Sequence, residues 1–133
     1  HFGGNMQITT GIDIIEVDRI KSAVQELGDT FLNKIYTMSE IEYCNKSKGD
    51  IKYQHLAARF AAKEAVFKAL SENIDTREDL PWKFIEVVNN DHGRPMINVE
   101  KLKEKSFSNL KSIDISISHI KEYAVASVVA VIE

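Results

Sequence analysis

The stretch with the clearest chemical content runs from Arg59 to Lys68 and reads RFAAKEAVFK. Its alanines and aromatic residues recur at helical spacing, so it predicts a buried helix that also carries an acid and several bases. Glu64 falls at the edge of the apolar face. A carboxylate there pairs with a base, ligates a metal ion or opens into a cleft, because an unpaired buried charge is costly.

The helix alone leaves these interpretations open. Glu64 and Lys68 are four residues apart, the spacing of an ordinary ion pair on a solvated flank, which stabilises a helix by only about 0.2–0.5 kcal/mol. A second acid, Asp13, lies between isoleucines in a segment rich in β-branched residues, 7–17, which predicts a strand. Gly11 shares a strand face with Asp13 and would let another element approach closely. Asp13 is either a hydrogen-bonded structural acid or a functional one.

Two carboxylates on different elements suit a hard cation. Magnesium takes oxygen ligands and is typically held by one or two carboxylates together with water and substrate phosphates. In that arrangement, positive charge for phosphate oxygens and a leaving group would come from Arg59, Lys63, Lys68 and His119. His119 stands at a strand end beside a turn, where a histidine either reaches a ligand or serves the fold.

The elements that must position these residues follow from periodicity and turn signals. Helices are predicted from about residue 19 with Asp18 as N-cap, at 29–35, from Ser39 as N-cap to about 45, at 51–70 and at 100–108. Strands are predicted at 7–17, 82–88, 96–99, 113–119 and 123–132, with the middle two forming a hairpin. The last strand is apolar on both faces and therefore central or covered by a neighbour. The fold class is α+β, with a mainly antiparallel sheet packed on a long helix.

Composition sets further bounds. The chain has 133 residues, 44% hydrophobic and 28% charged, which fits one soluble domain at 6–133. A net charge of −3 provides no general basic field for nucleic acid or an anionic membrane. Cys44 is the only cysteine, so there is no intramolecular disulfide. No membrane-spanning run or secretory signal is visible, so a cytoplasmic location is expected, and residues 1–5 look like an expression remnant.

Three separated motifs, in this order and spacing, resemble one family. They are Gly11-Ile12-Asp13 with Glu16, Asp18, Arg19 and Ile20; Arg59 to Ala65 with Lys68; and Ser116-Ile117-Ser118-His119 with Tyr123-Ala124. The combination resembles the holo-acyl-carrier-protein synthases, the small 4′-phosphopantetheinyl transferases. The resemblance spans nearly all of the chain from Met6 onward.

This resemblance implies transfer of 4′-phosphopantetheine from coenzyme A to a serine of apo-acyl carrier protein, with release of adenosine 3′,5′-bisphosphate, in support of fatty acid biosynthesis. It implies that Asp13 and Glu64 hold Mg²⁺, with Glu64 as a base for the serine and Lys68 as a donor to the leaving phosphate. Coenzyme A phosphates would be met by Arg59, Lys63, Lys68 and His119. The carrier protein would be met by Arg19 and Lys21. A homotrimer with sites at the subunit boundaries is also implied.

One segment departs from the family pattern. Lys68 is followed by Ala69-Leu70-Ser71-Glu72-Asn73, without the glycine-rich turn that commonly borders the coenzyme A site in the family. Two other functions remain compatible with the residues. One is a magnesium-dependent phosphohydrolase that uses the same acids, and the other is a non-catalytic module that binds carrier protein.

Overall fold

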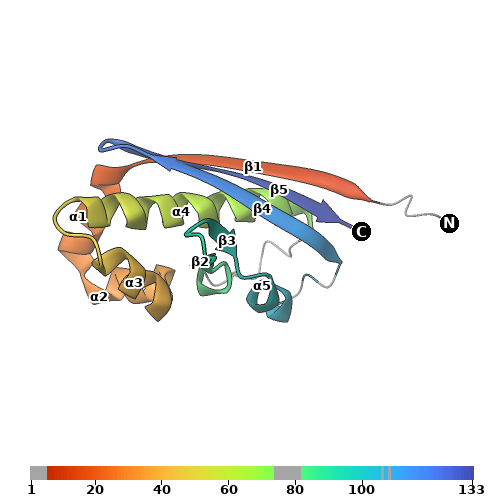
Figure 1. The fold of residues 1–133 in the computed structure, drawn as a ribbon, viewed down its shortest axis with the longest axis horizontal. Coiled ribbons are helices and arrows are strands. Elements are labelled where there is room, and N and C mark those ends of the chain that lie inside the picture. Colours follow the sequence, from red (N-terminus) through yellow and green to blue (C-terminus); the bar gives the residue numbers. More distant parts are fainter. Residues whose placement is uncertain (1–5, 74–81, 106, 108) are drawn as a thin grey trace.

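The main sheet of the protein lies over one long helix. The structure is a computed structural model that describes residues 6–73, 82–105, 107 and 109–133, so the expected remnant at 1–5 lies outside it. The sheet has the order β1-β5-β4 and pairs antiparallel throughout, from β1 (Gln7–Glu16), β5 (Tyr123–Ile132) and β4 (Leu110–His119). Helix α4 (Ile51–Leu70) runs lengthwise beneath it (Figure 1). The expected α+β class, the 20-residue helix and the central position of β5 are confirmed.

Small residues let α4 lie unusually close to the sheet. Ala61, Ala62 and Ala65 are fully buried on its sheet-facing side. Across from them, Gly11 of β1 has no side chain to intrude. A Cβ at Gly11 would overlap the carbonyl oxygen of Ala65 and lie 3.0 Å from the backbone nitrogen of Ala69. The close approach that Gly11 predicts is therefore an approach by α4 itself.

The outer face of β1 carries exposed isoleucines. Because strand residues alternate between faces, Gly11, Asp13 and Ile15 turn towards α4, while Ile12 and Ile14 turn away. Ile12 is 63% exposed and Ile14 65% exposed. In a single chain, the isoleucines on the outer side of β1 are therefore left exposed to solvent.

Shorter elements complete the fold around α4. Helices α1 (Val17–Leu27), α2 (Asp29–Ile35) and α3 (Met38–Asn45) gather near its N-terminal end (Figure 1). The hairpin of β2 (Val87–Asn89) and β3 (Pro95–Ile97) and helix α5 (Val99–Lys105) lie below α4 in the same view. The segment expected as a strand at 82–88 instead opens with a 3₁₀ turn, Trp82–Phe84, and only its end joins β2. No helix within the described ranges is long and apolar enough to cross a membrane.

Two helix starts differ from the sequence-based prediction. Helix α1 begins at Val17, so its N-cap is Glu16 and Asp18 lies in the first turn. Helix α3 is capped by Thr37 rather than by Ser39. The Thr37 hydroxyl accepts the backbone N–H of Glu40, and the Glu40 carboxylate accepts the backbone N–H of Thr37. This reciprocal pair satisfies two amide donors at once, which a cap at Ser39 would not do.

Candidate active site

Asp13 and Glu64 share one cleft. The approach of β1 to α4 at Gly11 brings the strand residue Asp13 next to the helix residue Glu64. Both line a pocket of about 370 Å³. Apolar walls come from Ile15, Ile20, Phe31 and Phe60, and Arg19 stands among the lining residues. The cleft therefore has an acidic part beside an apolar wall, with one guanidinium available.

The two carboxylates act on each other electrostatically. Burial raises the pKa of Glu64, the negative charge of Asp13 raises it further, and Lys68 opposes the rise. The group is half-buried, so these effects are moderated by solvent. Two acids whose charges repel in a partly desolvated cleft are stabilised by a cation placed between them.

Lys68 supplies such a charge, although not through the pair expected from helical spacing. Its Nζ donates to Asp13 Oδ1 at 3.2 Å and to the carbonyl oxygen of Ile12 at 2.9 Å. The Lys68 side chain is 52% exposed, so this ion pair is weak and the ammonium can turn towards another anion. Lys68 therefore contacts Asp13 on β1 rather than Glu64, which lies one turn earlier on α4.

The donor set fits a hard divalent cation. The described residues include no group of three or more His, Cys, Asp and Glu side chains that could cage a metal. Two carboxylates in an open cleft instead match the partial ligand set with which proteins hold Mg²⁺, where water and substrate phosphates complete the octahedron. Cys44 does not contribute, because it is fully buried and burial raises the pKa of its thiol to about 11.

Arg59 occupies a second pocket. Its guanidinium lies 4.1 Å from the centre of the Tyr43 ring, and Nη2 donates to Asn89 Oδ1 at 2.7 Å. Arg59 is only 3% exposed, and its Nε is buried without a hydrogen-bond partner. The pocket of about 260 Å³ also takes in Lys46 and Ser39. The two cations outnumber Glu42, the one acid among the lining residues, so the pocket favours an anionic ligand.

His119 belongs to this second group. Its Nδ1 lies 2.9 Å from Gln54 Oε1, and its ring meets His55 edge-on at 5.1 Å. An amide oxygen only accepts, so Nδ1 carries the proton and Nε2 is left for a ligand. His55 in turn packs against Tyr43, which places His119 and Arg59 along one row of rings. Burial and the neighbouring His119 lower the pKa of His55.

The candidate residues thus fall into two groups in one chain. Asp13 lies on β1 and His119 on β4, the opposite edges of the sheet, with β5 between them. The pocket around Asp13 and Glu64 shares no lining residue with the pocket around Arg59. Lys21 is in neither pocket and is bonded instead to Asp50 at 3.2 Å.

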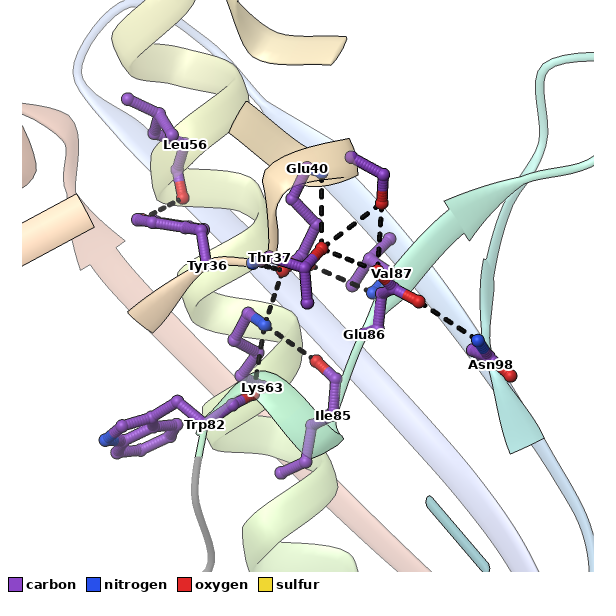
Figure 2. Close-up of polar contacts among 11 residues, drawn as sticks. Tyr36, Thr37, Glu40, Leu56, Lys63, Trp82, Ile85, Glu86, Val87 and Asn98 are labelled. Carbon is purple, nitrogen blue, oxygen red and sulfur yellow. Dashed lines mark hydrogen bonds and ion pairs between the residues drawn. The ribbon is translucent and has the colours of Figure 1, made fainter. Parts of the chain in front are cut away.

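Lys63 corrects the sequence-based expectation. It was expected to face coenzyme A phosphates, but its side chain is 0% exposed and its Nζ lies 2.8 Å from Glu40 Oε1 (Figure 2). Its ammonium also donates to the carbonyl oxygens of Trp82 and Ile85. An ammonium with three close acceptors and no exposure has no remaining direction in which to contact a phosphate.

Sequence reasoning also missed three residues that shape the second pocket. Glu40 and Glu86 hold its wall from the inside, and Asn89 binds Arg59. The spacing of Thr37 and Glu40 is that of a capping box, so a stricter search for that pattern could have found Glu40. No local pattern distinguishes Glu86 or Asn89, because their partners are distant in sequence.

The fold defines the class of protein. A crystal structure of the holo-(acyl-carrier-protein) synthase from Bacillus anthracis in complex with CoA (3′,5′-ADP) resembles this structure with a TM-score of 0.75 and 35% identity, covering 96% of this chain and 99% of that one. The α+β fold is therefore that of the 4′-phosphopantetheinyl transferases.

Sequence comparison assigns the family. The family model for the 4′-phosphopantetheinyl transferase superfamily matches residues 9–128. The holo-[acyl-carrier-protein] synthase of Ruminiclostridium cellulolyticum is 42% identical over 91% of this chain and 90% of its own. That of Thermodesulfovibrio yellowstonii is 44% identical over 90% of this chain and 94% of its own. The chain belongs to the 4′-phosphopantetheinyl transferase superfamily, and the resemblance read from its three motifs is confirmed.

Proposed function

We propose that the protein transfers 4′-phosphopantetheine from coenzyme A to a serine hydroxyl of apo-acyl carrier protein, releasing adenosine 3′,5′-bisphosphate. The observation that carries this proposal is the meeting of Asp13 and Glu64 in one cleft beside Lys68, in a chain more than 40% identical to holo-[acyl-carrier-protein] synthases. A role in fatty acid biosynthesis, in the cytoplasm, follows from that activity.

Asp13 and Glu64 would hold the magnesium ion. When bound, the ion supplies charge neutralisation at the pyrophosphate of coenzyme A and fixes the groups for in-line displacement. Support comes from the repulsion between the two carboxylates, which a divalent cation would relieve. Because Asp13 is also the partner of Lys68, a cation on Asp13 would free the ammonium of Lys68.

Residues of the chain itself accept the proton, stabilise the leaving group and bind the carrier protein. Glu64 accepts the proton of the attacking serine hydroxyl. Lys68 donates to the phosphate of the departing nucleotide. Arg19, at the rim of the cleft, meets the acidic carrier protein, and Lys21 contributes positive charge on the same helix.

In a site shared between subunits, Arg59 and His119 of one subunit would bind the phosphates of coenzyme A, while Asp13 and Glu64 come from its neighbour. The reason is geometric, since one chain holds Asp13 and His119 at opposite sheet edges. A homotrimer that brings the β1 edge of one subunit to the β4 edge of the next would complete the site. The exposed isoleucines of β1, Ile12 and Ile14, provide an apolar surface for such packing.

The test is the mass of a purified apo-acyl carrier protein after incubation with this protein, coenzyme A and Mg²⁺. A gain equal to one phosphopantetheine, dependent on both coenzyme A and Mg²⁺, is expected. Release of phosphate without modification of the carrier would instead identify a phosphohydrolase. No reaction, with carrier binding retained, would identify a non-catalytic module.

A further inference from the structure

A buried ionic cluster joins α3 and α4 to the base of the β2–β3 hairpin (Figure 2). At its centre, Lys63 Nζ donates to Glu40 Oε1 at 2.8 Å, to the Trp82 carbonyl at 3.0 Å and to the Ile85 carbonyl at 2.8 Å. Three acceptors require three N–H hydrogens, so the group is an ammonium. Burial lowers the pKa of Lys63, and the charge and hydrogen bond of Glu40 counteract that effect.

The two acids of the cluster hold the backbone of the hairpin. Glu40 Oε2 accepts the backbone N–H of Val87 at 3.0 Å, at the start of β2. Glu86 accepts from Ser39 Oγ at 2.9 Å and from Asn98 Nδ2 at 3.0 Å, just after β3. The backbone N–H of Asn98 also donates to the Glu86 carbonyl at 2.9 Å. One cluster therefore fixes both ends of the hairpin to α3 and α4.

The outer side of this cluster is a wall of the Arg59 pocket. Ser39 and Val87 line that pocket and are bonded to Glu86 and Glu40 on their inner sides. Two residues beyond Val87, Asn89 receives the hydrogen bond of Arg59 Nη2. Arg59 precedes Lys63 by one helical turn, so the pocket cation and the cluster cation rise from the same stretch of α4.

From this geometry we infer that Glu40, Lys63 and Glu86 are positioning residues that hold Asn89 and the pocket wall at the distance Arg59 needs to bind a nucleotide phosphate. The functional half of this inference rests on the proposed binding of coenzyme A at Arg59. An apolar trio of the same volume would stabilise the fold as well or better, but it would not fix the hairpin through directed hydrogen bonds.

Hydrogen exchange tests the positioning without any ligand. The variants are Lys63→Met and Glu86→Ala, the second of which leaves the Lys63–Glu40 ion pair intact and so guards against failure to fold. The control is Leu70→Ala, which truncates a fully buried side chain at the C-terminal end of α4. In both cluster variants the Asn90 amide, bonded to the Arg94 carbonyl, is expected to exchange about tenfold faster while β5 amides change less. Leu70→Ala is expected to speed both regions together. Equal acceleration of hairpin and β5 in the cluster variants would overturn the inference.

Binding of adenosine 3′,5′-bisphosphate, measured by calorimetry on the folded variants, tests the functional half. Glu86→Ala is expected to weaken binding and raise the KM for coenzyme A about tenfold, with kcat and the KM for carrier protein nearly unchanged. Leu110→Ala, which truncates a fully buried side chain outside both pockets, should bind as the wild type does. Normal binding by Glu86→Ala, with Arg59→Ala weakened, would overturn the positioning inference alone. If Arg59→Ala binds as the wild type does, the proposed nucleotide pocket is wrong, and the functional half of the inference falls with it.

Discussion

Gly11→Ala should damage both the fold and the candidate metal site. The added Cβ would overlap the Ala65 carbonyl oxygen and lie 3.0 Å from the Ala69 backbone nitrogen, so backbone rather than a flexible side chain must move. Overpacking of this kind costs about 1–3 kcal/mol, and more where the backbone cannot yield. The melting temperature is expected to fall by roughly 3–15 °C.

The same substitution should weaken metal binding. β1 carries Asp13 two residues from Gly11, and α4 carries Glu64 next to Ala65, so separating the two backbones separates the two carboxylates. Mg²⁺ tolerates little departure from ligand distances of about 2.0–2.1 Å. A displacement of about an ångström is expected to lower turnover by about 10²-fold.

The assays are thermal unfolding, calorimetric titration with Mg²⁺ and transfer of phosphopantetheine to apo-carrier protein. Gly28→Ala is the matched control, because its backbone has a φ of 57°, which strains any added side chain, yet nothing lies within 4 Å of the new Cβ. It should lose about 1 kcal/mol of stability and keep its metal affinity. Wild-type stability and metal affinity in Gly11→Ala would refute the close approach of β1 and α4 as the basis of the site.

Four further predictions address charge and assembly. Because the pKa of Glu64 is raised in the folded protein, its ionised carboxylate destabilises the fold, and this loss of stability develops as pH rises towards the raised pKa. Glu64→Gln should therefore raise the melting temperature of the metal-free protein at neutral pH and abolish the Mg²⁺ binding measured by calorimetry. For the same reason, the affinity of the metal-free protein for Mg²⁺, measured by calorimetry, should already fall on the acid side at a pH above the ordinary 4.5, because protons compete for Glu64; an affinity unchanged down to that pH would exclude Glu64 as a metal ligand. Lys63→Met should cost about 3–5 kcal/mol in urea unfolding by leaving Glu40 buried without a counter-ion, and Glu40→Gln in the same chain should recover part of it. Ile12→Glu, on the 63% exposed outer face, should give monomers in light scattering with unchanged circular dichroism and lose transfer activity; a fully active monomer would refute the shared site.

Most of the secondary structure was predictable because it depends on local spacing. The long helix at Ile51–Leu70 and the last strand at Tyr123–Ile132 have the bounds that their periodicity predicts. Errors occurred where side-chain hydrogen bonds decide an end, as in the capping of α3 by Thr37 rather than Ser39. The segment at 82–88 also misled, since its β-branched and aromatic composition suits either a strand or a partly buried 3₁₀ turn.

The candidate site was predictable only as residue types. The motifs identified Asp13, Glu64 and Lys68 together, but helical spacing favoured Lys68 as a partner of Glu64, whereas its ammonium contacts Asp13. Lys63 shows the same limitation more clearly. It neighbours Glu64 in sequence, yet one residue of helix rotation turns it into the core, where it meets Glu40.

By itself, then, the sequence determined the family, the order of the elements and the acids and bases available for catalysis, because motif spacing and hydrophobic periodicity are properties of a single stretch of chain. Tertiary structure decided which of these groups meet. The absence of a side chain at Gly11 brings Asp13 to Glu64, and strand order places His119 at the opposite edge of the sheet. Contacts between residues so far apart in sequence depend on how strands pair and how closely backbones pack, which no local pattern specifies.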